Sequence, residues 1–206
     1  PNGIPTNESP FQYILEAIKN AGYEAGKDLA ISIDAAASEF YEDGKYHLSI
    51  EGRTLTADEL IAYYQTWMEK YPIVTIEDML DEDDWENWTK LHQISKQHKI
   101  ELIGDDLTVT NQERLQKAID TDAISSILIK LNQIGSLTET VDTCILAKKH
   151  GMMSVPSHRG GGETNDAAMV DLAVAVGGTY IKVGPTRGER VSKYNRLMEI
   201  ERELRS

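Results

Sequence analysis

Pro72-Ile-Val-Thr-Ile-Glu77 is a short apolar run that closes on a carboxylate and is followed by a longer helical pattern. β-Branched residues favour strands, and a strand without polar alternation is typical of a parallel sheet buried on both faces. The same arrangement recurs along the chain, in runs that end at Asp34, Asp105, Lys130, His158 and Lys182. Strands that alternate with helices in this way predict βα units and a parallel sheet.

Each of these six runs ends on an ionisable residue, at intervals of 24 to 43 residues. The carboxyl ends of parallel strands share one face, so the six groups are expected on one rim. We predict a TIM-type α/β barrel with about six βα units in one domain over residues 1–206. A complete barrel has eight strands, so the domain is expected to be incomplete at its N-terminal side. An open, doubly wound six-stranded sheet is the alternative, but charges from all six strands suit a closed ring better.

Local signals place three further elements. A helical pattern covers Pro10–Ala21, with Asn7 and Ser9 as expected caps. Asp43-Gly44 predicts the turn of a small hairpin within a polar segment. Thr56–Glu59 has the spacing of a capping box and predicts the start of a helix.

Composition excludes several classes of protein. The 206 residues include 21 lysines and arginines against 34 acidic residues, a formal charge of -13, which disfavours nucleic acid as a partner. No apolar run approaches the roughly 18 residues of a membrane span. The single cysteine, Cys144, lies in a helical apolar pattern and is expected to pack in the core. We therefore expect a cytoplasmic protein.

The three acidic strand ends, Asp34, Glu77 and Asp105, predict a Mg²⁺ site. Hard carboxylate oxygens are the ligands that Mg²⁺ prefers, and a buried trio of negative charges is costly without a cation. The alternative is that each carboxylate caps a helix or is solvated. Asp78 and Asp106 follow two of the three directly, as further ligands or as residues that hold the ligands in place.

The remaining strand ends carry nitrogen-containing side chains. Lys130 and Lys182 each follow apolar residues, and a lysine held away from water acts as a base, although a snorkelling side chain is the alternative. His158-Arg159-Gly160-Gly161-Gly162-Glu163-Thr164 precedes a helical pattern and suits an anion such as phosphate. The other histidines are expected at the surface: His47, His92, His98 and His150.

Longer blocks around these residues resemble the enolase family. The blocks follow one another in order over essentially the whole chain: Asp34–Tyr41, Ile76-Glu77-Asp78, Asp83-Asp84-Trp85, Gly104–Asn111, Lys130–Ser136, Ser157-His158-Arg159, Glu189-Arg190 and Lys193-Tyr194-Asn195. Blocks of this length are far more specific than a single short motif.

The resemblance implies a phosphopyruvate hydratase, a lyase that converts 2-phosphoglycerate to phosphoenolpyruvate in glycolysis with Mg²⁺. By the same resemblance, Lys130 matches the base, and His158, Arg159 and Lys182 match substrate-binding positions. Asp34, Glu77 and Asp105 match the metal ligands. The implied partner is a phosphorylated hydroxy acid, and the full-length form is expected to be a homo-oligomer.

The chain departs from the family pattern in two places and is expected to lack one region. Glycines 160–162 replace a Ser-Gly pair, and Met79 stands where the family has proline. The family's general-acid residues are expected upstream of Pro1, so we expect the chain alone to be inactive. Two alternatives remain open, namely another enolase-superfamily racemase or dehydratase and a non-catalytic enolase-like binding protein.

Overall fold

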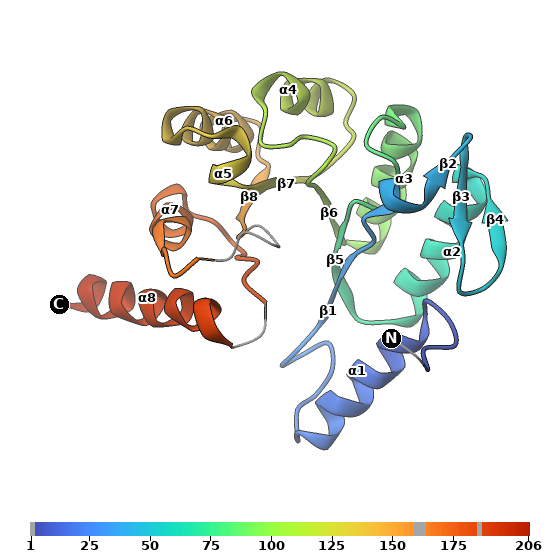
Figure 1. Ribbon diagram of the computed structural model, residues 1–206, viewed down its shortest axis with the longest axis horizontal. Coiled ribbons are helices and arrows are strands. Elements are labelled where there is room, and N and C mark those ends of the chain that lie inside the picture. The colour runs from blue at the N-terminus through green and yellow to red at the C-terminus, as the bar shows by residue number, and fades with distance from the viewer. Residues whose placement is uncertain (1–2, 159–163, 185–186) are drawn as a thin grey trace. The chain divides into compact units, whose positions relative to one another are not determined.

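The computed structural model describes residues 3–158, 164–184 and 187–206 (Figure 1). They form two compact units, which we call unit 1 (residues up to Leu107, with Thr121–Ile124) and unit 2 (Thr108–Asp120 and Ser125–Ser206). Each unit combines parallel strands with helices, which confirms the predicted α/β class.

Unit 1 is built on three parallel strands in the order β1, β5, β6. The strands are β1 (Ile31–Asp34), β5 (Ile73–Glu77) and β6 (Glu101–Gly104). The helices are α1 (Ser9–Asn20), α2 (Ala57–Lys70) and α3 (Trp85–His98), with a short 3-10 helix, η1 (Ala37–Phe40). β5 is buried except at Val74, as expected for a central parallel strand.

A small antiparallel sheet interrupts the βα rhythm of unit 1 after β1. Its strands are β2 (Tyr41–Glu42), β3 (Lys45–Leu48) and β4 (Arg53–Leu55), in the order β2-β3-β4. Asp43 and Gly44 have φ values of 51° and 77°, the two positive angles that a tight hairpin turn needs, so the predicted turn is confirmed. The sheet packs against α2 (Figure 1).

Of the two helix starts predicted in unit 1, one has the expected capping residues and the other does not. The capping box at α2 is present in full, because Thr56 and Glu59 each accept a main-chain N–H of the other. The expected caps of α1 are wrong, since the helix starts after Glu8, whose side chain makes no capping hydrogen bond, and the Thr6 hydroxyl accepts the N–H of Ser9 at 3.2 Å. The Asn7 side chain instead donates to Glu51, 44 residues away, at 2.6 Å.

The core of unit 1 contains one residue that was expected outside. His92 on α3 is only 2% exposed, and its Nδ1 lies 2.7 Å from the carbonyl oxygen of Asp122. The expectation of a surface histidine is therefore wrong, because the residue shares the buried face of α3 with Trp88 and Leu91. Burial lowers the pKa of the His92 imidazole.

Unit 2 contains two paired parallel strands, β7 (Ser126–Ile129) and β8 (Met153–Pro156). Its helices are α4 (Gln112–Asp120), α5 (Leu131–Ile134), α6 (Leu137–Lys149), α7 (Ala168–Val176) and α8 (Gly188–Arg205). Cys144 packs in the core beside Leu115, Ile127 and Leu172, which confirms the structural role expected for it. In Figure 1, α7 lies next to α8.

The run that ends at Lys182 is the weakest of the six predicted strands. Lys182 forms only an isolated parallel bridge with Ser157, so the extended pairing expected there is absent from the described residues. The other five runs are strands; four end at or within one residue of the predicted position, and β8 ends at Pro156, two residues before His158. Among the described residues, no helix combines the length and apolarity required to cross a bilayer.

Candidate active site

The three acidic strand ends of unit 1 lie on neighbouring strands. Asp34 pairs in register with Glu77, and Glu77 pairs with Ile103, two residues before Asp105. Glu77 and Asp105 are buried, with 3% and 6% of their surface exposed, whereas Asp34 is exposed. Parallel pairing therefore brings the main chains of the three predicted metal ligands to one end of this sheet.

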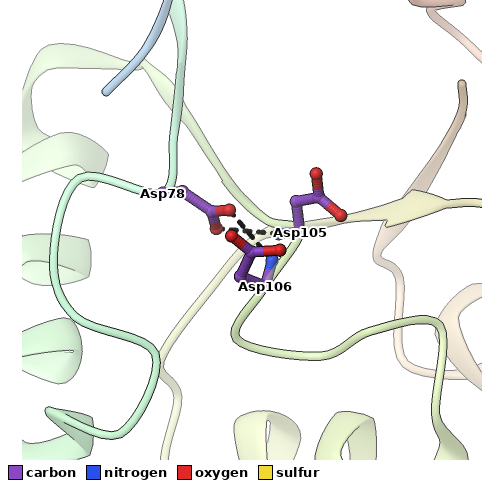
Figure 2. A group of neighbouring side chains, drawn as sticks. All are labelled: Asp78, Asp105 and Asp106. Atoms are coloured by element: carbon purple, nitrogen blue, oxygen red, sulfur yellow. Dashed lines mark hydrogen bonds between the residues drawn. The ribbon is translucent and has the colours of Figure 1, made fainter. Parts of the chain in front are cut away.

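Asp78 holds the segment that follows β6 in place (Figure 2). Its carboxylate accepts the main-chain N–H groups of Asp105 and Asp106, both at 2.9 Å, and the residue is 4% exposed. Its own backbone has a φ of 44°, in the left-handed region that few non-glycine residues adopt. The main-chain oxygen of Asp78 also accepts the N–H of Ala37, so one residue links the ends of β1, β5 and β6.

Asp78, Asp105 and Asp106 form an acidic cluster (Figure 2), with one carboxylate oxygen from each lying within 4.8 Å of the others. Burial raises the pKa of Asp78 well above its ordinary value, the two N–H donors oppose this shift, and the charges of Asp105 and Asp106 add to it. The donor set consists of hard oxygen atoms with excess negative charge, which fits a divalent cation such as Mg²⁺. Asp34 and Glu77 do not join this cluster in the described part of the chain.

Asp34 has a local role as well as a place at the strand end. Its Oδ1 accepts the N–H of Ala36 at 3.1 Å, which supports a residue with a φ of 45°. Asp34 also lines a pocket of about 410 Å³ whose walls include Ser32, Phe11 and Trp67. Asp34 is exposed, in line with the alternative that the carboxylate is solvated, and this leaves the proposed ligand role open.

In unit 2, Lys130 follows β7 directly and is half-buried. Its main-chain N–H donates to the Thr110 hydroxyl at 2.9 Å, and its carbonyl oxygen accepts the N–H of Gln133 in the first turn of α5. Strand pairing, the hydroxyl and the helix start together fix the backbone from which the Lys130 side chain extends.

His158 and Lys182 lie side by side. The N–H of Lys182 donates to Pro156, and the carbonyl oxygen of Lys182 accepts the N–H of His158 at 3.3 Å. The same oxygen lies 3.1 Å from His158 Nδ1, which places a proton on Nδ1 because a carbonyl only accepts. Both side chains are half-buried, and the predicted substrate residue Arg159 lies outside the described residues.

Two functional-site features were not foreseen. Thr110 carries no sequence signal for its role, since its contact with Lys130 depends on a left-handed backbone. Lys193, in a quoted block but without an assigned role, is 3% exposed on α8 and donates to the carbonyl oxygens of Thr164 and Glu189. Lys193 lies on a helix, whereas the two predicted site lysines follow apolar runs at strand ends, and a buried lysine is uncommon at either place.

Comparison with known proteins gives a consistent family. The model of the family described as "Enolase, C-terminal TIM barrel domain" matches residues 1–206. An enolase from Natranaerobius thermophilus is 52% identical over 202 residues, which cover 98% of this chain and 47% of that protein. The chain thus spans about half the length of this curated relative. It belongs to the enolase family, and its residues correspond to the C-terminal TIM-barrel domain of that family.

Proposed function

We propose that the protein, at its natural length, is a Mg²⁺-dependent phosphopyruvate hydratase that converts 2-phosphoglycerate to phosphoenolpyruvate and water. The observation that carries this proposal is the register of Asp34 and Glu77 on neighbouring strands, with Asp105 just beyond the next. Membership of the enolase family and 52% identity to an enolase support it. A bound Mg²⁺ would supply positive charge for the substrate carboxylate as negative charge develops on it.

Asp34, Glu77 and Asp105 are proposed to hold the metal, and Asp78 keeps Asp105 in position through the main chain. Asp106 belongs to the same acidic cluster and is proposed as a candidate fourth metal ligand. A proton next to a carboxylate is very weakly acidic, and its removal becomes feasible only where positive charge stabilises the anion formed.

Lys130 is proposed as the base that removes this proton. The backbone around it is fixed by hydrogen bonds on both sides, which supports this role because a base must be held in reach of its proton. His158, Lys182 and Arg159 are proposed to bind the phosphorylated substrate. In the described pair, the carbonyl oxygen of Lys182 orients the His158 ring.

The remaining parts of the proposal concern the whole protein. We propose that the general acid lies in the half of the relative that this chain does not span, so that the chain alone shows no turnover. A glycolytic role, a cytoplasmic location and a homo-oligomeric full-length form belong to the same proposal.

The test is formation of phosphoenolpyruvate from 2-phosphoglycerate by the natural-length protein, with and without Mg²⁺. We expect Mg²⁺-dependent turnover that is lost in Lys130→Ala and kept in Lys148→Ala, which changes an exposed lysine on α6. Absence of turnover in the wild type, despite measurable Mg²⁺ binding, would contradict the proposed substrate. Proton exchange into other 2-hydroxy acids would then favour a different reaction of the superfamily.

A further inference from the structure

The segment between β6 and α4 contains two adjacent β-branched residues in the left-handed region. Val109 has a φ of 45° and Thr110 a φ of 57°. Branching at Cβ makes this region costly, so such residues stay there only where surrounding contacts enforce the conformation. Glycine or asparagine would fit the backbone better, which implies that the Thr110 side chain has a specific task.

Contacts on three sides hold Thr110, which is completely buried. Its carbonyl oxygen accepts the hydroxyl of Thr143 on α6 at 3.0 Å. The next residue, Asn111, caps α4 by accepting the N–H groups of Glu113 and Arg114 at 2.9 and 3.1 Å. The hydroxyl of Thr110 thereby points to the end of β7, where it accepts the N–H of Lys130 at 2.9 Å.

This last hydrogen bond completes the support of a single peptide unit. The carbonyl oxygen of Ile129 accepts the N–H of Ser157 at 2.9 Å, and the N–H of Lys130 in the same peptide donates to Thr110. A peptide group is planar, so hydrogen bonds on its two sides fix its orientation. The orientation of this peptide in turn sets the direction in which the Lys130 side chain leaves the backbone.

We propose that Thr110 is a positioning residue for Lys130: its hydroxyl fixes the peptide that precedes the base. Thr110 needs no contact with the substrate for this role. The inference rests on the proposed function, in which Lys130 removes the proton. It assigns to the strained residue Thr110 the task of orienting the side chain of Lys130, which follows β7.

The test compares Thr110→Val, which replaces the hydroxyl by a methyl group of similar size, with Thr110→Ser, which keeps the hydroxyl. In the natural-length protein, we expect kcat for 2-phosphoglycerate to fall at least about tenfold in Thr110→Val, because a small displacement of a catalytic group is expensive, with KM little changed. Thr110→Ser is expected to stay within about threefold of the wild type, since it keeps the hydrogen bond.

Two further variants separate positioning from stability. Thr110→Ala lacks both the hydroxyl and the branch, so it is expected to fold even if Thr110→Val does not, and to show the same loss of kcat. Val109→Gly relieves the backbone without touching the hydroxyl, and its kcat is expected to match the wild type. Equal kcat in Thr110→Val, Thr110→Ala and Thr110→Ser, measured on folded protein, would overturn the inference.

Amide hydrogen exchange at Lys130 gives a readout that does not depend on activity. Exchange is expected to be slow in the wild type and Thr110→Ser and faster in both hydroxyl-free variants, because the N–H then lacks its acceptor. If the wild type shows this exchange pattern but no turnover, the proposed function is contradicted and the support of Lys130 by Thr110 still stands. Exchange that is indifferent to the hydroxyl would overturn the positioning role itself.

Discussion

The strand ends of the two units carry opposite charges but are held in the same way. In unit 1, the acidic residue Asp105 donates its main-chain N–H to the carboxylate of Asp78. In unit 2, the basic residue Lys130 donates its main-chain N–H to the hydroxyl of Thr110. In both cases, a residue from a neighbouring loop holds the main chain of the site residue. Orientation is thus set through the backbone, and it does not require the charged end of the site side chain.

Asp78 and Thr110 differ in chemistry, and this difference decides how strongly a substitution at each residue affects stability. Asp78 is a buried carboxylate that accepts two N–H groups, so its removal leaves two buried donors without an acceptor. Thr110 is a neutral hydroxyl that accepts one. We therefore expect unit 1 to be the more sensitive to substitution of its support, to acid and to cations.

The largest effect is expected for Asp78→Ala. Loss of the acceptor for two buried N–H groups should lower the free energy of unfolding by about 2–6 kcal/mol, since each unsatisfied group costs about 1–3 kcal/mol. Urea unfolding measures this difference. Asp106→Ala is the matched control, because it removes a neighbouring negative charge and keeps the carboxylate of Asp78. A loss under about 1 kcal/mol in Asp78→Ala would show that the segment after β6 is held by other contacts.

The next effect concerns Mg²⁺. If the acidic strand ends bind the ion, Mg²⁺ at 100 times its Kd should stabilise the wild type by about 2.7 kcal/mol, because only the folded state binds it. Asp105→Asn should lose most of this gain, and Glu86→Gln, which changes an acid with 84% exposed surface on α3, should keep it. Thermal unfolding with and without Mg²⁺ checks both. Equal stabilisation of the two variants would place the cation elsewhere.

A smaller effect on the free energy of unfolding is expected from protonation of His92 at low pH. Its pKa in the folded protein lies below the unfolded value, so the folded state binds its proton later than the unfolded state as pH falls. The contribution of the neutral ring is complete above the unfolded pKa of about 6.5 and is lost as pH drops through the folded pKa, with a slope of at most about 1.4 kcal/mol per pH unit.

The comparison uses His92→Asn, whose amide can still donate to the carbonyl of Asp122 but does not titrate. Its stability should lack the component that His92 adds below pH 6.5. His150→Asn changes an exposed histidine at the end of α6 and should retain the wild-type pH dependence. Identical pH profiles for the wild type and His92→Asn would exclude His92 as a source of acid sensitivity.

The smallest effect is expected for Lys193→Met in unit 2. A buried ammonium held by two carbonyl oxygens loses much of its hydration, and an apolar side chain of similar length recovers packing without that cost. The free energy of unfolding should change by no more than about 1 kcal/mol. A loss as large as that of Asp78→Ala would show that unit 2 also depends on a buried charge.

The sequence predicts five of the six strand ends to within two residues, because an apolar run and an ionisable residue near its end mark each of them. Asp43-Gly44 and the Thr56–Glu59 box were equally readable, since both act within a few residues. The expected cap at Asn7 is wrong because its side chain is engaged by Glu51, a long-range partner that no local pattern reveals.

Roles that depend on the direction of a side chain could not be predicted from the sequence. Asp78 and Asp106 both follow predicted strand ends, and only the fold shows that the Asp78 carboxylate turns back onto the main chain. His92 has a polar helical context, and its burial depends on which face of α3 meets the rest of unit 1. The metal-binding role of Asp34, Glu77 and Asp105 and the substrate role of Lys130, His158, Arg159 and Lys182 stay predictions.

The distribution of tryptophan makes the two units optically distinguishable. All three tryptophans, Trp67, Trp85 and Trp88, lie in unit 1, and two of them are buried in its core. Indole fluorescence therefore follows the melting of unit 1 alone, whereas far-ultraviolet circular dichroism follows the helices of both. Coincident curves from the two signals would show that the units unfold together, and separated curves would give each unit its own transition.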